Sequence, residues 1–195
     1  MSRWFVLFSI VAGLADLALA ERPSVDYIFP AGGQRGTTVA IRVGAHYLHG
    51  GSPFTMDGLG VDASKRNEET STTWFEGPMI FKPASQRGEN YPRDHAGQVI
   101  IASDAPLGIR DWRIWTSQGV TPSREFVVGD LVEVIEDEVD GRPIPQAVQT
   151  PTTINGRIFP REDVDIWTFQ ASEGETITCR VVAHSIGSPL DSVLE

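Results

Sequence analysis

Few side chains in this 195-residue sequence could do chemistry, and its four histidines are the first to consider. His46 and His49 have a His-x-x-His spacing that could suggest a metal pair, but residues three apart on a strand point to opposite faces. Asp94 and His95 are adjacent and Ser85 is nearby, so a hydrolytic triad is conceivable. No nucleophile elbow or oxyanion motif accompanies them. We therefore expect neither a metal centre nor catalysis at these positions.

A run of acidic residues is the second candidate. Residues 130–140 hold six acids and no base. Within this run Glu136, Asp137, Glu138 and Asp140 could bind Ca²⁺, because hard cations take several carboxylate oxygens. Their spacing matches no EF-hand loop, and a solvated linker is the interpretation we favour. The sequence therefore predicts no cofactor, with calcium at these four residues as the alternative.

Trp115 and Cys179 are the remaining candidates. Trp115 lies on the opposite face of its predicted strand from Trp112, so an exposed Trp115 could stack on a sugar ring or contact a protein partner. Packing against the loop or the neighbouring domain is the interpretation we favour. Cys179 shares one face of a predicted strand with Ile177 and Val181. We therefore expect a small core residue there and not a nucleophile.

The first residues predict export. Residues 1–20 combine a positive start at Arg3, an apolar run and a small-x-small cleavage site at residues 18–20, which is typical of a secretory signal peptide. The run is shorter than the about 20 apolar residues of a membrane span. An uncleaved anchor is the alternative. We expect a mature chain that begins at Glu21 and is secreted, periplasmic or at the cell surface, with no membrane association after cleavage.

The net charge and the cysteine content narrow the range of partners that the chain could bind. The net charge of −10 argues against nucleic acid, whose phosphates need a basic surface. A single cysteine cannot form an internal disulfide, so an exported chain must be held together by its core. The expected partners are therefore cell-surface or extracellular proteins or polysaccharides.

The elements that must position these side chains are predicted to be strands. Short alternating apolar runs separated by Gly, Pro, Asn and Asp are typical of an all-β sandwich. The clearest strand is 38–43, where Val39, Ile41 and Val43 share one face. Further strands are expected at residues 73–81, 98–102, 109–116, 125–128, 152–159, 164–170 and 175–183. The polar stretch 82–97 predicts a long surface loop.

The glycine-rich stretch 28–48 raises the possibility of a phosphate-binding loop. Such a loop places its glycines between a strand and a helix. Here the glycines lead into a β-branched alternating run, and both the Walker lysine and GxGxxG are absent. Gly32, Gly33 and Gly36 are therefore predicted to be turn residues that permit positive φ.

These motifs resemble the start of an IPT/TIG-type immunoglobulin-like domain. The matching positions are Pro30, Gly33, Gly36, Thr37, Val39, Ile41, Val43, Gly44 and Leu48. Residues 105–130 resemble the closing hairpin of that family, with Gly108, Thr116, Gly119 and Phe126 in the expected order. The resemblance implies an Ig-like β-sandwich over residues 21–129 and indicates fold, not activity.

Residues 151–195 resemble the first half of a bacterial pre-peptidase C-terminal (PPC) domain. The matching motifs are Asn155-Gly156-Arg157-Ile158, Asp163-Val164-Asp165, Trp167 and Phe169, Gly174-Glu175, and residues 187–192. The resemblance implies an incomplete jelly-roll-like β-sandwich after an acidic, proline-rich linker at 130–150. It also implies that the chain is the N-terminal piece of a larger modular protein. Asp163 and Asp165 are expected to order a turn.

Three functions fit these observations. The first is a non-catalytic exported β-sandwich module for adhesion, spacing or surface binding within a larger modular protein. The second is the accessory N-terminal region of a secreted peptidase or other hydrolase whose catalytic domain lies outside these residues. The third is a polysaccharide-binding module. We expect no catalytic residue in the chain itself.

Overall fold

A computed structural model describes residues 22–48, 50–71, 92–137, 144–158 and 163–194. These residues are all-β: they contain no α-helix, and their one helical turn is the 3₁₀ turn η3 (His184–Ile186). Within the same residues, no helix has the length and apolar character needed to cross a membrane. The predicted signal peptide, the predicted strand 73–81 and most of the predicted loop 82–97 lie outside the described residues.

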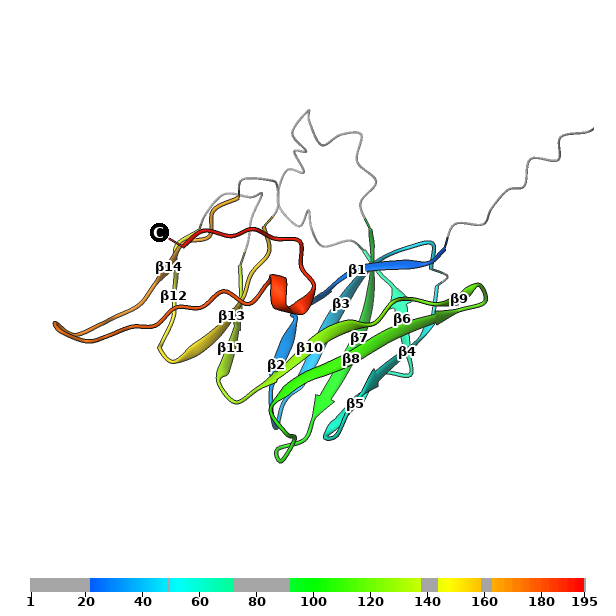
Figure 1. The fold of residues 1–195 in the computed structure, drawn as a ribbon, viewed down its shortest axis with the longest axis horizontal. Helices are drawn as coiled ribbons and strands as arrows, with labels where there is room; N and C mark the ends of the chain where they lie inside the picture. Colours follow the sequence, from blue (N-terminus) through cyan, green and yellow to red (C-terminus); the bar gives the residue numbers. More distant parts are fainter. Residues whose placement is uncertain (1–21, 49, 72–91, 138–143, 159–162, 195) are drawn as a thin grey trace, which may run out of the picture.

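Ten strands form one mixed sheet (Figure 1). They are β1 (Ser24–Phe29), β2 (Gly32–Gln34), β3 (Thr38–His46), β4 (Ser52–Asp57), β5 (Val61–Ala63), β6 (Arg66–Glu69), β7 (Arg93–Ile101), β8 (Gly108–Thr116), β9 (Gly119–Val120) and β10 (Arg124–Gly129). The order is β1-β3-β7-β6-β4-β8-β10-β2, with β5 on β7 and β9 on β8. Only the β10–β2 pair is parallel. β1 and β2 are the first and last strands of this order, and only two residues separate them in the chain. The two edges of the sheet therefore lie close together, and the sheet is barrel-like and nearly closed.

The core lies between the two halves of this sheet. From one half, β3 contributes Ile41 and Val43, which are buried on the same face. From the other half come Trp112 on β8 and Phe126 on β10, both fully buried. All of them belong to one apolar cluster. Burial of such side chains is the main favourable term in folding.

The predicted strands of this region are confirmed where the structure describes them. Strands 38–43, 109–116 and 125–128 lie within the longer β3, β8 and β10, and 98–102 lies in β7 apart from its last residue. The strands run longer than predicted because pairing extends them past the apolar residues into polar ones, as at the start of β7.

Two of the three predicted turn glycines were assigned wrongly. Gly36 has the positive φ of a turn, at 81°. Gly32 and Gly33, however, are residues of β2 in parallel register with Val127 and Val128 of β10. A Cβ at Gly32 would lie 2.6 Å from the carbonyl oxygen of Val127, so close packing between backbones, and not turn geometry, excludes a side chain there.

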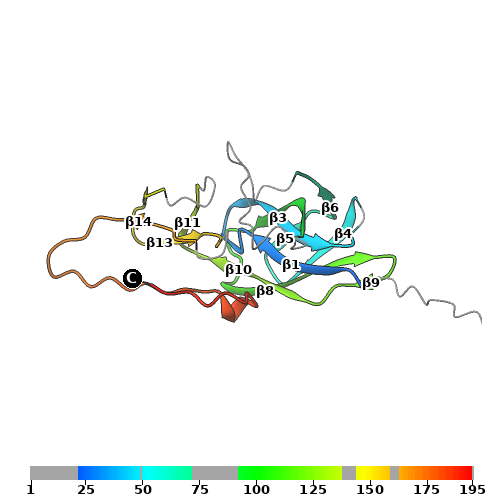
Figure 2. The same ribbon diagram turned by 90° about the horizontal axis from the view of Figure 1, so that it is seen from above.

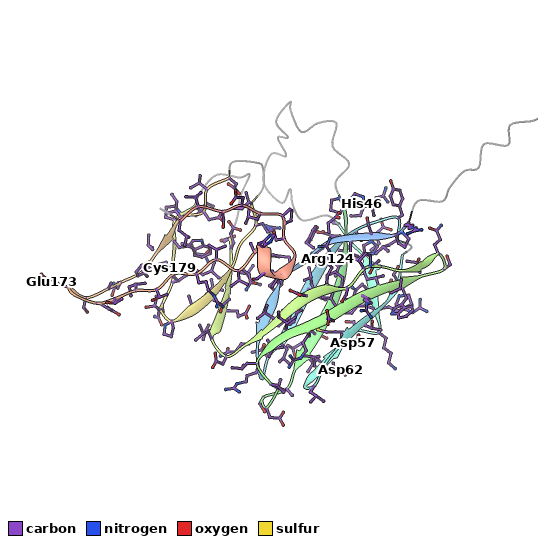
Figure 3. All side chains as sticks on the ribbon, viewed as in Figure 1. His46, Asp57, Asp62, Arg124, Glu173 and Cys179 are labelled. Carbon is purple, nitrogen blue, oxygen red and sulfur yellow. The ribbon has the colours of Figure 1, made fainter. Side chains whose placement is uncertain are left out.

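The C-terminal part forms two small parallel sheets. β11 (Val132–Ile135) pairs with β13 (Thr152–Asn155), and β12 (Gln146–Ala147) pairs with β14 (Trp167–Thr168). The predicted strands 152–159 and 164–170 are therefore much shorter than expected, and the described residues of 175–183 form no strand. The chain reaches its farthest point from the main sheet near Glu173 and returns along this segment through Cys179 (Figure 3). Strands need pairing neighbours, and the alternating apolar pattern here has none.

The stretch predicted to be a linker contains β11 and β12 and contacts the main sheet. The backbone N–H of Ala31, between β1 and β2, donates to Oδ1 of Asn155 at 3.2 Å. Nδ2 of Asn155 donates to Oε2 of Glu133 at 2.7 Å, so one buried amide joins three segments. The guanidinium of Arg157 lies over the ring of Phe29, 4.9 Å from its centroid.

The last described segment also contacts the main sheet. Figures 1 and 2 show η3 beside β10, and the two elements are in contact. Nη1 of Arg124 donates to the carbonyl oxygen of Gly187 at 3.1 Å, while its Nε and Nη2 donate to the carbonyl oxygen of Val25. Arg124 thereby ties β10 to β1 and to the residues that follow η3.

Candidate functional site

Trp115 lies at the edge of an open surface hollow. Alternation along β8 turns Trp112 and Ile114 into the core and Trp115 outward, with 47% of its surface exposed. The indole Nε1–H donates to Oγ1 of Thr55 on the neighbouring strand at 3.2 Å. This bond orients the ring without burying it. The hollow is lined by Gly51, Ser52, Pro53, Trp115, Thr116 and Ser117.

This hollow can bind by contact and by hydrogen bonding, because its lining is mainly apolar with hydroxyl groups among it. Among the predicted site residues that the structure describes, Trp115 is the one that lines this hollow. It does not take part in a cluster of titratable groups. An exposed aromatic ring held by a hydrogen bond loses little rotamer freedom on binding, which favours an interaction role.

Asp94 and His95 lie in a strand, so the predicted loop 82–97 is wrong over its last residues. Both belong to β7 and, as neighbours on a strand, point to opposite faces of the sheet. Buried Asp94 accepts a hydrogen bond from the Tyr27 hydroxyl, and Nη1 of Arg42 is 4.0 Å from it. His95 points toward the core face and is 2% exposed. The two side chains therefore do not face a common site, and Ser85, the third residue of the conceivable triad, lies outside the described residues.

The histidine pair predicted as a possible metal site is described only in part. Nε2 of His46 lies 3.0 Å from Oδ2 of Asp26, and Figure 3 shows His46 at one end of the main sheet. His49 lies outside the described residues. Across the described parts of the chain, no three His, Cys, Asp or Glu side chains are grouped so that they could hold a metal ion.

The structure describes only the first part of the acidic run, up to Asp137. Glu138 and Asp140 lie outside the described residues, and the backbone N–H of Asp137 donates to Oε1 of Gln146 at 3.2 Å. Oε2 of Glu136 accepts the backbone N–H of Arg157 at 2.7 Å. Of the two calcium candidates that the structure describes, Glu136 is the one next to another acid, Asp165. Calcium at these residues stays a prediction.

Glu136 and Asp165 form a carboxyl pair against Gly156. A Cβ at Gly156 would lie 3.3 Å from Oδ2 of Asp165 and 3.4 Å from Oε2 of Glu136. Burial, then the hydrogen bond and negative charge of Glu136, raise the pKa of Asp165 to about 7, although the charge of Arg157 opposes the shift. Burial also raises the pKa of Glu133, against the effect of its hydrogen bond with Asn155. Near neutral pH the Glu136–Asp165 pair shares a proton.

Cys179 is exposed, so its prediction as a core residue is wrong. The prediction assumed a strand over residues 175–183 with one buried face. The segment is extended and unpaired in the structure, so alternation does not create a buried face there. Figure 3 shows Cys179 in the C-terminal part, well away from His46 on the main sheet.

Several interacting residues gave no sequence signal. Asn67 lies in the polar stretch 66–69 and is completely buried. Tyr27 crosses over Gly44, where a Cβ would collide with its ring, and in this way reaches Asp94. The Asn155-Gly156 motif is visible in the sequence. The role of Asn155 in joining Ala31 to Glu133 is not, because the contact with Ala31 spans more than a hundred residues.

No family model matches the chain, and a search of curated proteins finds no match either. The resemblances to IPT/TIG-type and PPC domains therefore rest on the motif residues alone. The interpretation of the hollow beside Trp115 rests on its own geometry.

Proposed function

We propose that this chain is a non-catalytic exported β-sandwich module that binds a cell-surface or extracellular partner within a larger modular protein. The observation that carries the proposal is Trp115, exposed on the outer face of β8, oriented by Thr55 and next to an open hollow. Tryptophan is enriched among the few interface residues that supply most binding energy. A rigid main sheet below it gives such a contact a fixed position.

In this proposal residues 22–129 form an Ig-like sandwich of the IPT/TIG type. Support comes from two strand groups, β1-β3-β7 and β4-β8-β10-β2, around one apolar cluster. The motif glycines also have structural roles that a side chain would disturb: a Cβ at Gly33 would lie 2.5 Å from the Val39 side chain and 2.6 Å from that of Ile101. Face-to-face groups of antiparallel strands with a shared core are the architecture of β-sandwiches.

Residues 151–195 would belong to a PPC-type β-domain that needs further strands to bury its apolar residues, and β11 and β12 of the preceding stretch 130–150 pair with it. Val132, Ile154, Ile166 and Phe169 are all at least 36% exposed, although they belong to strands or lie beside them. This interpretation retains the alternative that the chain is an accessory region of a secreted hydrolase. The parent reading frame distinguishes a hydrolase from an adhesion protein.

The binding proposal is tested on the mature chain with arrays of immobilised polysaccharides and of extracellular proteins. We expect binding on one array, weakened at least about tenfold by Trp115→Ala, because truncating a central interface tryptophan typically costs 2 kcal/mol or more. Ile109→Ala is the matched control, since Ile109 is an exposed apolar residue of the same strand, also facing outward, but does not line the hollow.

The outcomes separate the alternatives. Trp115-dependent binding to polysaccharide selects a polysaccharide-binding module, and Trp115-dependent binding to protein selects adhesion. Absence of binding on both arrays, or equal binding by Trp115→Ala and wild type, would contradict the proposal.

A further inference from the structure

The two halves of the main sheet are joined along a narrow seam, β6. β6 pairs with β4 at two positions, Ser52–Asn67 and Pro53–Arg66, and with β7 at two positions, Glu68–Ala96 and Glu69–His95. By contrast β3 and β7 pair over eight positions. The seam is therefore the part of the sheet with the least backbone pairing between the halves.

Two buried polar side chains lie on this seam. Asn67 is 0% exposed and His95 is 2% exposed. Among the described residues, neither amide atom of Asn67 nor Nδ1 of His95 has a hydrogen-bond partner. Nearly all buried polar groups in native proteins are hydrogen-bonded, so two neighbouring exceptions require an explanation. The free-energy cost of burying these unpaired polar groups therefore arises at the part of the sheet with the least backbone pairing.

The surroundings of His95 keep the imidazole neutral. β3 presents apolar Val43 beside it, β6 presents Glu68 and Glu69, and its own strand presents Arg93 and Asp94. Burial lowers the pKa of His95 below its ordinary value of 6.5, and Arg93 adds to this, while Glu69, Asp94 and Glu68 act in the opposite direction. Burial is the largest of these effects.

We propose that β6 is an acid-labile joint: protonation of buried His95, whose Nδ1 has no hydrogen-bond partner, loosens β6 from β7. A protonated imidazole carries two N–H donors and a full charge. Burying this charge with a donor at Nδ1 that has no partner costs far more than burying the neutral ring. Opening the seam exposes His95 to water and removes this cost.

The linkage between proton binding by His95 and opening of the joint determines how the stability of the joint changes with pH. The native pKa lies below the unfolded value of about 6.5, so the open form binds protons more readily than the closed form. The joint is therefore fully stable above pH 6.5 and weakens as the pH falls toward the native pKa. Below that value no further weakening arises from His95.

Hydrogen exchange read by mass spectrometry on the mature chain, corrected for intrinsic rates, tests the joint. We expect peptides covering β6 and the first half of β7 to keep their protection from pH 7.5 to 6.5 and to lose it below pH 6.5, by at most about tenfold per pH unit. Peptides of β8 and β10 should change less. His95→Gln should abolish the pH dependence, whereas His46→Gln, on neighbouring β3, should keep it.

Two further measurements test the joint: hydrogen exchange of the Asn67→Leu variant, and titration of His95 followed by NMR. Replacing a buried unpaired amide by an apolar group of similar size should raise protection across β6. In the wild type, His95 should titrate below the ordinary histidine value of 6.5. The proposal is overturned if His95 titrates at its ordinary value, if β6 exchanges alike at both pH values, or if His95→Gln retains the wild-type pH response.

Discussion

Residues 22–129 and residues 130–194 carry the same kind of sequence pattern and fold very differently. Every buried hydrophobic side chain among the described residues belongs to the first region. In the second, buried Asn155 is polar, and apolar residues such as Val164 and Phe169 are 58% and 43% exposed. β3 and β7 have nine residues each, whereas β12 and β14 have two.

The difference teaches that alternation stabilises a strand only when pairing partners are present. In the first region, each apolar face meets the opposite half of a nearly closed sheet. In the second, the sheets have two strands each, and two-stranded sheets are marginal without further cover. Contacts such as Asn155 with Ala31 attach the second region without giving it a core.

The largest expected effect comes from truncating an aromatic residue in each region. Trp112→Ala should lower the free energy of unfolding by about 3–5 kcal/mol, because it empties a fully buried site that packs against Phe54. Phe169→Ala should cost less than about 1 kcal/mol, since its ring is 43% exposed. Chemical denaturation measures both. Equal costs would mean that the second region has a core of its own.

A smaller effect is expected from the residue that joins the regions, Arg124. Arg124→Ala removes the donors to the carbonyl oxygens of Val25 and Gly187, which should lower stability by about 1–2 kcal/mol. Proteolysis near residues 183–188 should accelerate at the same time. Arg124→Lys is the informative control, because one ammonium cannot reproduce the planar fork. Unchanged proteolysis in both variants would show that η3 is held by other contacts.

The two regions should also respond to pH in opposite directions. The pKa of Asp165 is raised from 3.8 to about 7, so its closed form binds the additional proton. The stabilisation is complete below pH 3.8 and is lost as the pH rises through about 7. Hydrogen exchange at Gln146 and Val148, whose N–H groups bond to Ile166 and Thr168, should therefore accelerate between pH 5 and 7. The proposed His95 joint weakens in acid instead.

Asp165→Asn is the decisive variant for this pH response. Its amide can donate to Glu136 at any pH, so exchange at the two small sheets, corrected for the intrinsic pH dependence of amide exchange, should become independent of pH. Asp163→Asn, two residues away, should keep the wild-type response. A carboxyl titration of Asp165 at an ordinary value, followed by ¹³C NMR, would contradict the shared proton.

The smallest effect is expected at Cys179. Because the side chain is exposed and unpaired, Cys179→Ser should change stability by no more than about 0.5 kcal/mol. A thiol reagent should also label Cys179 completely in the native protein, without denaturant. Labelling that requires unfolding would instead place this cysteine in a core and would make the two regions more alike.

The sequence by itself determined the all-β class and four strands of the first region, β3, β7, β8 and β10, but not the other six. Period-two alternation at Val39, Ile41 and Val43 is a local property, and it locates a strand wherever a partner is available. The same local rule failed at residues 175–183, because a partner strand is not a local property. It also failed at Gly32 and Gly33, where a parallel strand over ninety residues away sets the packing.

Only the tertiary structure decided which polar groups meet. Asp165 joins Glu136 from a separate segment, Asn155 reaches Ala31, and His95 is buried although its flanking sequence is polar. Hydrogen-bond partners and burial depend on chain segments brought together by the whole sheet, and those contacts leave no local spacing in the sequence. Trp115 is the intermediate case: alternation placed it opposite Trp112, and the neighbouring Thr55 fixed its orientation at the surface.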